Sequence, residues 1–260
     1  MAYEHIRVDR EGHVTIITLN RPDVMNALHS PAHFEMHEAL DAFAADPEQW
    51  VGIITGAGER AFSAGNDLKH QATGGEMRSP PTGFAGLTSR FDLNKPLIAA
   101  VNGVAMGGGF EIALACDIIV AAESAVFALP EPRVGLAALA GGLHRLPRAI
   151  GVKRAMGMIL TGRRVTAAEG ETLGFVNEVV PASELMPAAR RWAAQIAELS
   201  PMSIRASKEA VFKGLDEPTL EAAIRGQNRY PAVSALFSSE DFVEGPMAFS
   251  QKRAPNWKGR

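Results

Sequence analysis

The feature that most constrains this chain is a series of short, almost entirely apolar segments separated by stretches long enough to form helices. These segments cover residues 14–19, 51–55, 97–101 and 118–122. Strands that are apolar throughout are typical of parallel sheets whose two faces are both covered. The pattern therefore predicts an α/β fold, and a chain of 260 residues is long enough to bury a large core.

The limits of the first helix follow from turn and cap signals. The apolar segment 14–19 ends at a turn sequence, Asn-Arg-Pro-Asp, at residues 20–23. Ser30 can cap a helix, Pro31 suits the first helical position, and Asp46-Pro47 is a stop signal. We expect a helix between these signals.

Helical periodicity replaces the short apolar segments after about residue 183. We therefore predict an α/β core over residues 1–200 and a helical region over residues 201–260. Residues 72–87 are rich in Gly, Pro and Ser, which predicts a loop over the surface, of the kind that forms a mobile flap near a site.

Charge and cysteine content exclude several classes of protein. Lys and Arg number 26 against 29 Asp and Glu, so the net charge of -3 is too balanced for a protein that mainly binds nucleic acid. The single cysteine, Cys116, excludes a disulfide framework and a multi-cysteine metal site, and it favours the reducing cytoplasm. No signal peptide is evident, and the most apolar windows, such as 134–143, are about half as long as a membrane span.

Two glycine-containing turns are candidates for binding negative charge. The run 107–109 precedes an expected helix at 111–116, where consecutive glycines let backbone N–H groups approach a ligand. Residues 62–68 form a second turn. One N–H group from each turn, directed at one oxygen, would form an oxyanion hole. A tight turn or close helix packing is the alternative, and the spacing matches no dinucleotide-binding or P-loop motif.

Glu111 and Glu131 both stand among apolar residues. Glu111 follows the glycine run, and Glu131 lies between two prolines. A desolvated carboxyl group has a raised pKa and can exchange protons near neutral pH, which makes both residues candidates for acid–base catalysis. The alternative is that each caps a helix or pairs with an arginine such as Arg133.

Other reactive residue types are assigned structural roles. His33 and His37 are four positions apart, but the order differs from the H-E-x-x-H zinc motif, so we expect a solvated helix face and no metal. Ser63 lacks the nucleophile-elbow motif of serine hydrolases. Cys116 is expected to be a small buried core residue inside an apolar helix.

Taken together, seven segments resemble the crotonase superfamily of enoyl-CoA hydratases and isomerases, and their order and spacing cover nearly the whole chain. They are NRPDVMNAL (20–28), AFSAGNDL (61–68), PLIAAVNGVAMGGGFE (96–111), FALPE (127–131), LTGR (160–163), GFVN (174–177) and EGPMAFSQKR (244–253). Within the superfamily, residues 83–87, 127–131 and 257–260 are similar to those of carnitinyl-CoA dehydratases.

The resemblance implies repeated ββα units wound into a spiral, with C-terminal helices that assemble the chain into a homotrimer or a hexamer. It implies an acyl-CoA thioester as substrate, with coenzyme A entering as part of that substrate and no permanently bound cofactor. Backbone N–H groups of Asn66 and Gly108 would hold the thioester oxygen, and Glu111 and Glu131 would hold and activate water.

The resemblance also assigns residues that contact coenzyme A. Its binding wall maps to Met25, Ala27, Ala64, Asp67 and Leu68. Lys252 matches a lysine that approaches the CoA phosphates, often from a neighbouring subunit, and a solvated surface lysine is the alternative. Ala138 and Leu139 depart from the family, whose hydratases usually have Pro-Gly there. We expect this departure to fill space at the water site and to favour a different acyl group.

The expected reaction is the reversible addition of water to a 2-enoyl-CoA. Glu111 would act as base toward the water and Glu131 as the acid that protonates C2, while the two N–H groups stabilise enolate charge. The alternatives are a carnitinyl-CoA dehydratase-like or other specialised acyl-CoA lyase, a double-bond isomerase, and a non-catalytic acyl-CoA binder. Two desolvated carboxylates argue against the binder because they reduce stability.

Overall fold

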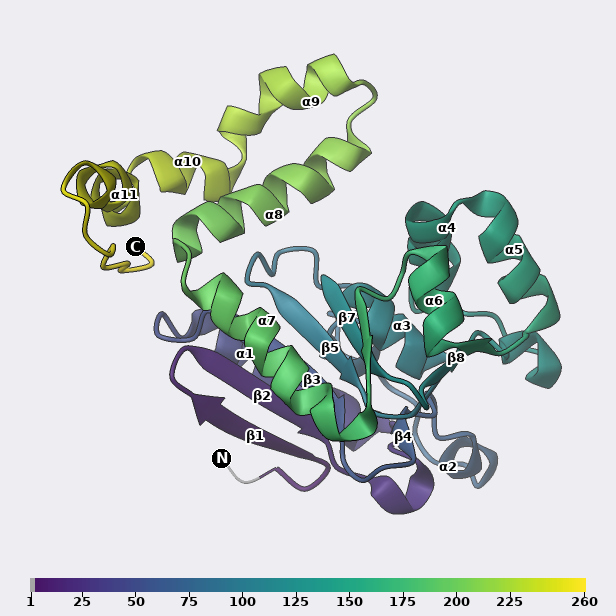
Figure 1. The fold of residues 1–260 in the computed structure, drawn as a ribbon. Helices are drawn as coiled ribbons and strands as arrows, with labels where there is room; N and C mark the ends of the chain where they lie inside the picture. Colours follow the sequence, from purple (N-terminus) through teal and green to yellow (C-terminus); the bar gives the residue numbers. More distant parts are fainter. Residues whose placement is uncertain (1–2) are drawn as a thin grey trace.

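The computed structural model describes residues 3–260 and contains a larger and a smaller sheet (Figure 1). The larger sheet has the strand order β1 (Ile6–Glu11), β2 (Val14–Leu19), β3 (Val51–Gly56), β5 (Leu97–Val101), β7 (Ile118–Ala122) and β10 (Glu178–Val180). The smaller sheet has the order β4 (Ala61–Ser63), β6 (Val104–Met106), β8 (Val126–Ala128) and β9 (Val165–Thr166). All pairings are parallel except those of β1 with β2 and of β8 with β9.

The chain winds through both sheets in repeated turns. Strands β3 and β4 are followed by helix α2 (Leu68–Ala72), and β5 and β6 by α3 (Gly108–Ala115). Strands β7 and β8 are followed by the 3-10 turn η3 (Glu131–Val134) and by α4 (Gly142–Ile150). Each turn adds one strand to each sheet and then a helix, so the predicted α/β spiral of ββα units is confirmed.

The parallel order of the smaller sheet brings the expected site residues to one edge. Strands β4, β6 and β8 are parallel neighbours, so the segments that leave their carboxyl ends lie close together. These segments are residues 64–67, 107–111 and 129–131, which contain both glycine turns and both candidate glutamates. Residues that are about 65 positions apart in sequence therefore meet at one edge of this sheet because of strand order.

The central strands are buried because both faces of the larger sheet are covered. Helix α7 (Leu185–Ala197) lies across one face, where its buried residues join a core that includes Ile53 and Ile98. The adjacent residues Ile54 and Ala99 belong to the core on the opposite face, which includes α1 (Ser30–Ala45) and α3. Successive strand residues point to opposite faces, which explains why these strands are apolar throughout.

The predicted helical region at the C-terminal end is confirmed. After α7 it contains α8 (Pro201–Asp216), α9 (Leu220–Gly226), α10 (Pro231–Phe237) and α11 (Glu240–Ser250). These four helices extend away from the two sheets (Figure 1). The division into units at residue 200 remains a prediction.

The remaining elements are two helices and four short 3-10 turns: α5 (Val152–Thr161), α6 (Ala167–Leu173), η1 (Pro22–Val24), η2 (Phe84–Gly86), η4 (Ala182–Glu184) and η5 (Gln227–Arg229). Residues 73–83 contain neither helix nor strand, as predicted for this part of the loop. Among residues 3–260, no helix combines the length and apolar character needed to cross a bilayer.

Two local predictions were wrong. Helix α1 does start at Ser30, but its N-cap is His29. The Ser30 hydroxyl donates instead to the carbonyl of Glu76 at 2.7 Å and accepts from the N–H of Arg78, so it holds the loop after α2. Cys116 follows the end of α3 and is half-buried rather than enclosed within the helix.

Candidate active site

Glu111 lies in the first turn of α3 with only 3% of its surface exposed. Its Oε1 accepts a hydrogen bond of 2.8 Å from the N–H of Gly142, at the start of α4. The pKa of Glu111 is raised to about 7, mainly by burial and also by the nearby charge of Glu131, while the Gly142 N–H opposes this rise. A carboxyl group with this pKa can accept or release a proton near neutral pH.

Glu131 lies at the start of η3, directly after β8 and Pro130. Its Oε2 is buried and has no hydrogen-bond partner within residues 3–260, and burial raises its pKa. Its Oε1 faces the start of α3, since a Cβ atom on Gly107 would lie 3.0 Å from it. The two glutamates predicted from sequence therefore lie near each other and near the first turn of α3.

The candidate oxyanion donors lie on two segments in contact. Within residues 3–260, the N–H groups of Asn66 and Gly108 donate no hydrogen bond. Gly65 has a φ of 87°, and a Cβ atom there would be 2.8 Å from the Gly108 nitrogen. This close approach requires glycine. Two free N–H groups, one at a helix N-terminus, are thus available for an oxygen that develops negative charge.

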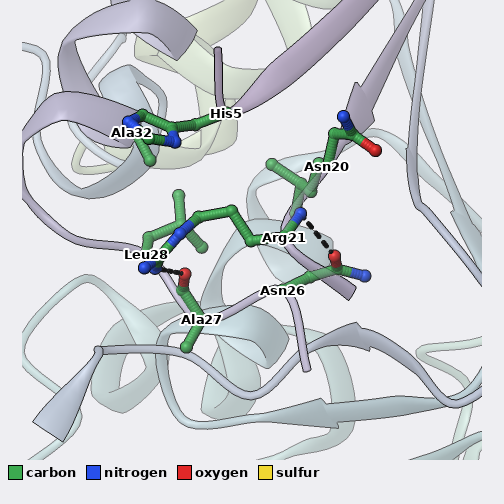
Figure 2. A pocket seen from close by; sticks show the side chains of 8 residues that line it. His5, Asn20, Arg21, Asn26, Ala27, Leu28 and Ala32 are labelled. Carbon is green, nitrogen blue, oxygen red and sulfur yellow. Dashed lines mark hydrogen bonds between the residues drawn. The ribbon is translucent and has the colours of Figure 1, made fainter. Parts of the chain in front are cut away.

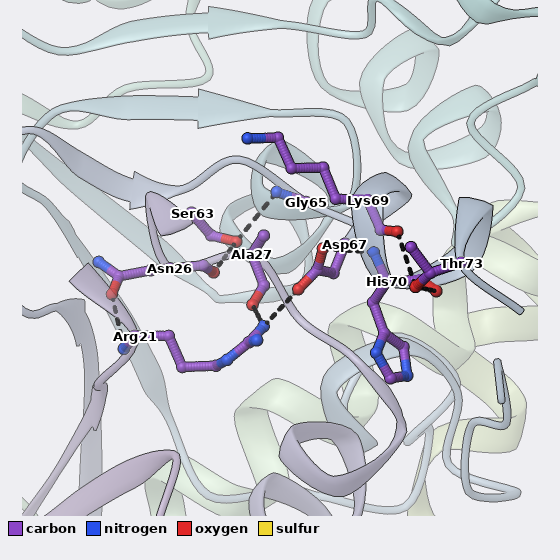
Figure 3. Close-up of polar contacts among 9 residues, drawn as sticks. All are labelled: Arg21, Asn26, Ala27, Ser63, Gly65, Asp67, Lys69, His70 and Thr73. Carbon is purple, nitrogen blue, oxygen red and sulfur yellow. Dashed lines mark hydrogen bonds and ion pairs between the residues drawn. The ribbon is translucent and has the colours of Figure 1, made fainter. Parts of the chain in front are cut away.

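The predicted CoA wall is formed by two segments that lie side by side. Ala64 donates its N–H to the carbonyl of Met25 at 2.9 Å, and Leu28 pairs with Asn66 as a parallel bridge. Arg21 joins the two segments, because its guanidinium donates to the Ala27 carbonyl and to Oδ2 of Asp67 (Figure 3).

Asp67 and Leu68 complete this wall. Burial raises the pKa of Asp67, but hydrogen bonds from the His70 N–H and from Arg21 lower it more, so Asp67 is ionised at neutral pH. Leu68 is 41% exposed and available to a ligand. The hollow beside this wall is lined by His5, Leu19, Asn20, Arg21, Asn26, Ala27, Leu28 and Ala32 (Figure 2).

Within a single chain, Lys252 does not lie beside the other candidate site residues. It follows α11, is exposed and has a φ of 53°. In Figure 1, α11 lies at the far end of the helical region from α2 and α3. A contact between Lys252 and a CoA ester at Glu111 would therefore need a neighbouring subunit, as the resemblance implies.

The departure at Ala138 and Leu139 leaves one contact of this loop with the site in place, and its effect on the acyl group stays a prediction. Ala138 is buried, whereas Leu139 is 79% exposed. Gly142, three residues further on, still donates its N–H to Glu111. The loop therefore keeps its contact with the carboxyl group despite the different sequence.

The prediction for the two histidines of α1 was wrong for His33. Its ring is buried, its Nδ1 accepts the N–H of Ala85 at 3.0 Å, and its edge packs against Phe84. His37 is half-buried. Among residues 3–260, no group of three or more His, Cys, Asp or Glu side chains is arranged to hold a metal ion.

Sequence reasoning missed Arg21 and Gly142 as parts of the site. Arg21 lies in the predicted turn at 20–23, and Gly142 lies in the apolar window 134–143. The residue types alone gave only a weak signal for a role in the site, because arginines on the surface and glycines at the start of helices are common. Only the contacts of these residues with Asp67 and Glu111 give them a role.

Comparisons with known proteins agree on the family. The chain matches the enoyl-CoA hydratase/isomerase family over residues 9–260. It is 47% identical to a carnitinyl-CoA dehydratase of Salmonella typhi, with 99% of each chain covered. An enoyl-CoA hydratase structure from Mycobacterium tuberculosis superposes with a TM-score of 0.92 at 36% identity, covering 98% of this chain and 99% of the other. A carnitinyl-CoA hydratase structure from Mycobacterium avium has a TM-score of 0.78 at 41% identity, with 98% and 99% covered.

The chain belongs to the enoyl-CoA hydratase/isomerase family, and it is an enzyme of the crotonase superfamily. The paired glutamates beside two free N–H groups fit this family, and the family and its relatives support a hydratase-type lyase activity.

Proposed function

We propose that this enzyme catalyses the reversible elimination of water from a 3-hydroxyacyl-CoA, with carnitinyl-CoA as its preferred substrate. The observation that supports the reaction type is the pair of desolvated carboxyl groups, buried Glu111 and half-buried Glu131, beside the free N-terminal N–H groups of α3. An isomerase needs only one carboxyl group as a proton shuttle. Two carboxyl groups can serve separately as the base toward water and as the acid toward C2.

The proposed hydration begins with Glu111 ionised and Glu131 protonated. Glu111 takes a proton from water as the water oxygen bonds to C3, and the electron pair of the double bond moves onto the thioester oxygen. The N–H groups of Asn66 and Gly108 stabilise this enolate. Glu131 then donates its proton to C2. Proton exchange between the two carboxyl groups restores the starting state, and dehydration follows the same steps in reverse.

The choice of acyl group is supported by the relatives. Full-length relatives named carnitinyl-CoA dehydratase are 46–47% identical, whereas the enoyl-CoA hydratase of Mycobacterium tuberculosis is 36% identical. Hydration of simple enoyl-CoAs is the second candidate, because the contact between the loop after Glu131 and Glu111 is intact despite its unusual sequence.

The experiment follows the ultraviolet absorbance of the conjugated enoyl thioester with crotonobetainyl-CoA and crotonyl-CoA in parallel. We expect faster turnover of crotonobetainyl-CoA, and a loss of roughly 100-fold to 10,000-fold in kcat for Glu111→Gln and for Glu131→Gln. Glu169→Gln, which changes a half-buried glutamate on α6, is the matched control and retains activity. Comparable or faster turnover of crotonyl-CoA would make the enzyme a general hydratase, and wild-type rates in Glu131→Gln would refute the assigned roles.

Three further expectations accompany this proposal. Coenzyme A enters and leaves as part of the substrate, and the enzyme holds no cofactor permanently. The chain assembles as a trimer or a hexamer, so that Lys252 reaches the CoA phosphates of a neighbouring subunit. The enzyme acts in the cytoplasm.

A further inference from the structure

Arg145 of α4 is a charged residue largely withdrawn from water. Its Nη2 donates a hydrogen bond of 2.8 Å to the carbonyl of Thr88, and its guanidinium lies 5.9 Å from the centre of the Phe91 ring. Burial lowers the pKa of Arg145. Withdrawing a guanidinium from water is unfavourable unless its contacts compensate. The contacts of Arg145 are therefore what keep it in this position.

On one side, Arg145 supports the turn that holds Glu111. Gly141 has a φ of 105°, and a Cβ atom there would be only 2.1 Å from Nη1 of Arg145. The guanidinium therefore fills the space where a side chain at position 141 would lie. The next residue, Gly142, donates its N–H to Glu111, so Arg145 sits directly behind the residue that holds this carboxyl group.

On the other side, Arg145 holds the segment that covers the start of α3. Its acceptor, Thr88, also accepts the N–H of Phe84 through Oγ1 at 3.0 Å. The Phe84 ring packs on Gly108, where a Cβ atom would be 2.4 Å from the ring. The segment from Phe84 to Thr88 thus covers Gly108, whose N–H the proposed function assigns to the thioester oxygen.

We propose that Arg145 is a positioning residue that holds the Glu111 carboxyl and the cover over Gly108 in fixed relation to each other. One rigid guanidinium contacts both the turn at Gly141 and the carbonyl of Thr88. This inference rests on the proposed function for its kinetic consequences. A planar guanidinium suits the role because its donors have a fixed geometry, which a lysine lacks.

The charge of Arg145 adds a second, separable effect on Glu111. The ionisable groups facing Glu111 are Glu131 from η3 and Arg145 from α4. Strands β4, β5 and β6 and the turn η2, which also pack against α3, contain no ionisable side chain. Burial dominates the raised pKa of Glu111, and Arg145 lowers it, so loss of the positive charge will raise it further.

The test compares Arg145→Met, Arg145→Lys and the control Arg148→Met, an exposed arginine on the same helix. Arg145→Met should lower kcat roughly tenfold to a hundredfold, as for a small misplacement of reacting groups. Its kcat/KM profile for hydration, which rises as Glu111 loses its proton, should also move to higher pH. Arg145→Lys should restore the pH profile but not kcat, and Arg148→Met should change neither.

Thr88→Val tests the same connection from the covering segment. It removes the acceptor of the Phe84 N–H, so we expect a lower kcat with an unchanged pH profile. If Arg145→Met fails to fold, as judged by circular dichroism, Arg145→Lys and Thr88→Val become the test of the positioning role. Wild-type kcat in both would overturn the proposal, as would a folded Arg145→Met with wild-type kcat and pH profile.

Failure of the proposed function is separately visible, since the wild-type enzyme would then be inactive on every enoyl-CoA ester. In that case hydrogen exchange of backbone amides reports on the connection directly. Faster exchange at Phe84 and Gly142 in Arg145→Met than in Arg148→Met would support the positioning role, and equal exchange would refute it.

Discussion

At the scale of single residues, acidity is decided by surroundings rather than by residue type. Glu111 is almost fully buried, and its pKa is raised to about 7. Glu169 is only half-buried and accepts a 2.7 Å hydrogen bond from Arg163, which lowers its pKa. Burial disfavours the charged form of a carboxyl group, and a cationic partner favours it.

The raised pKa of Glu111 links stability to pH in an unusual direction for a glutamate. The folded-state pKa of about 7 lies above the ordinary value of 4.5, so the folded protein binds more protons than the unfolded chain between these two values. Stability therefore falls as pH rises through this window. Glu111→Gln removes the effect, and we expect the variant to be more stable than wild type at pH 8 by at most about 3 kcal/mol.

The measurement is urea unfolding of wild type, Glu111→Gln and Glu169→Gln at pH 5 and pH 8. Glu111→Gln should gain stability relative to wild type between pH 5 and pH 8. Glu169→Gln should be slightly less stable than wild type at pH 8, because its carboxylate is stabilised by Arg163 in the fold. A Glu111→Gln variant whose stability relative to wild type is the same at both pH values would contradict the raised pKa.

At the scale of elements, the site depends on how close together the segments lie that follow two neighbouring parallel strands. Strands β4 and β6 are hydrogen-bonded neighbours, and Gly65 and Gly107 follow them, respectively, with positive φ angles. The loop after β4 presses on the start of α3 through Gly65, whose added Cβ would be 2.6 Å from the Met106 carbonyl. This contact therefore sets the distance between the free N–H groups of Asn66 and Gly108.

Gly65→Ala should separate the loop from α3. We expect kcat to fall roughly 100-fold to 1,000-fold, comparable to the loss of one oxyanion donor. Gly74→Ala is the matched control, since Gly74 has a similar φ of 81° but nothing lies within 4 Å of an added Cβ. Both variants have the same kind of backbone strain, and only Gly65→Ala has the collision. Equal kcat values in the two variants, measured with the same ester, would refute this account.

At the scale of the whole molecule, the helical region exposes an unusual amount of apolar surface. Large apolar side chains that are at least 43% exposed on helices α8 to α11 are Val211, Phe212, Leu215, Leu220, Ile224, Phe237, Phe242, Val243, Met247 and Phe249. Exposed apolar side chains mark association sites where they form a contiguous surface. The region extends away from the sheets (Figure 1).

We therefore predict that light scattering after size exclusion will give three or six times the chain mass of 27.7 kDa. Phe249→Asp places a charge at an 88% exposed position on α11 and should give smaller species. Phe91→Asp, at an 82% exposed position outside the helical region, should keep the wild-type mass. A wild-type mass of 27.7 kDa at micromolar concentration would contradict the predicted assembly.

The sequence by itself determined the α/β class, the buried strands, the C-terminal helices and the two glutamates that meet at α3. These features depend on local properties: apolar runs form buried strands, glycine runs permit close approach, and carboxyl groups among apolar residues become desolvated. The resemblance to the superfamily added the spiral of ββα units, which no local pattern contains.

Only the tertiary structure decided the surroundings of individual side chains. The bond between His33 and Ala85 spans 52 positions, that between Glu111 and Gly142 spans 31, and that between Arg145 and Thr88 spans 57. Such partners are chosen by how the strands are ordered and how the loops fold back over them. A side chain's burial and pKa depend on these distant partners, which is why His33 and Ser30 were misassigned and Arg145 was missed.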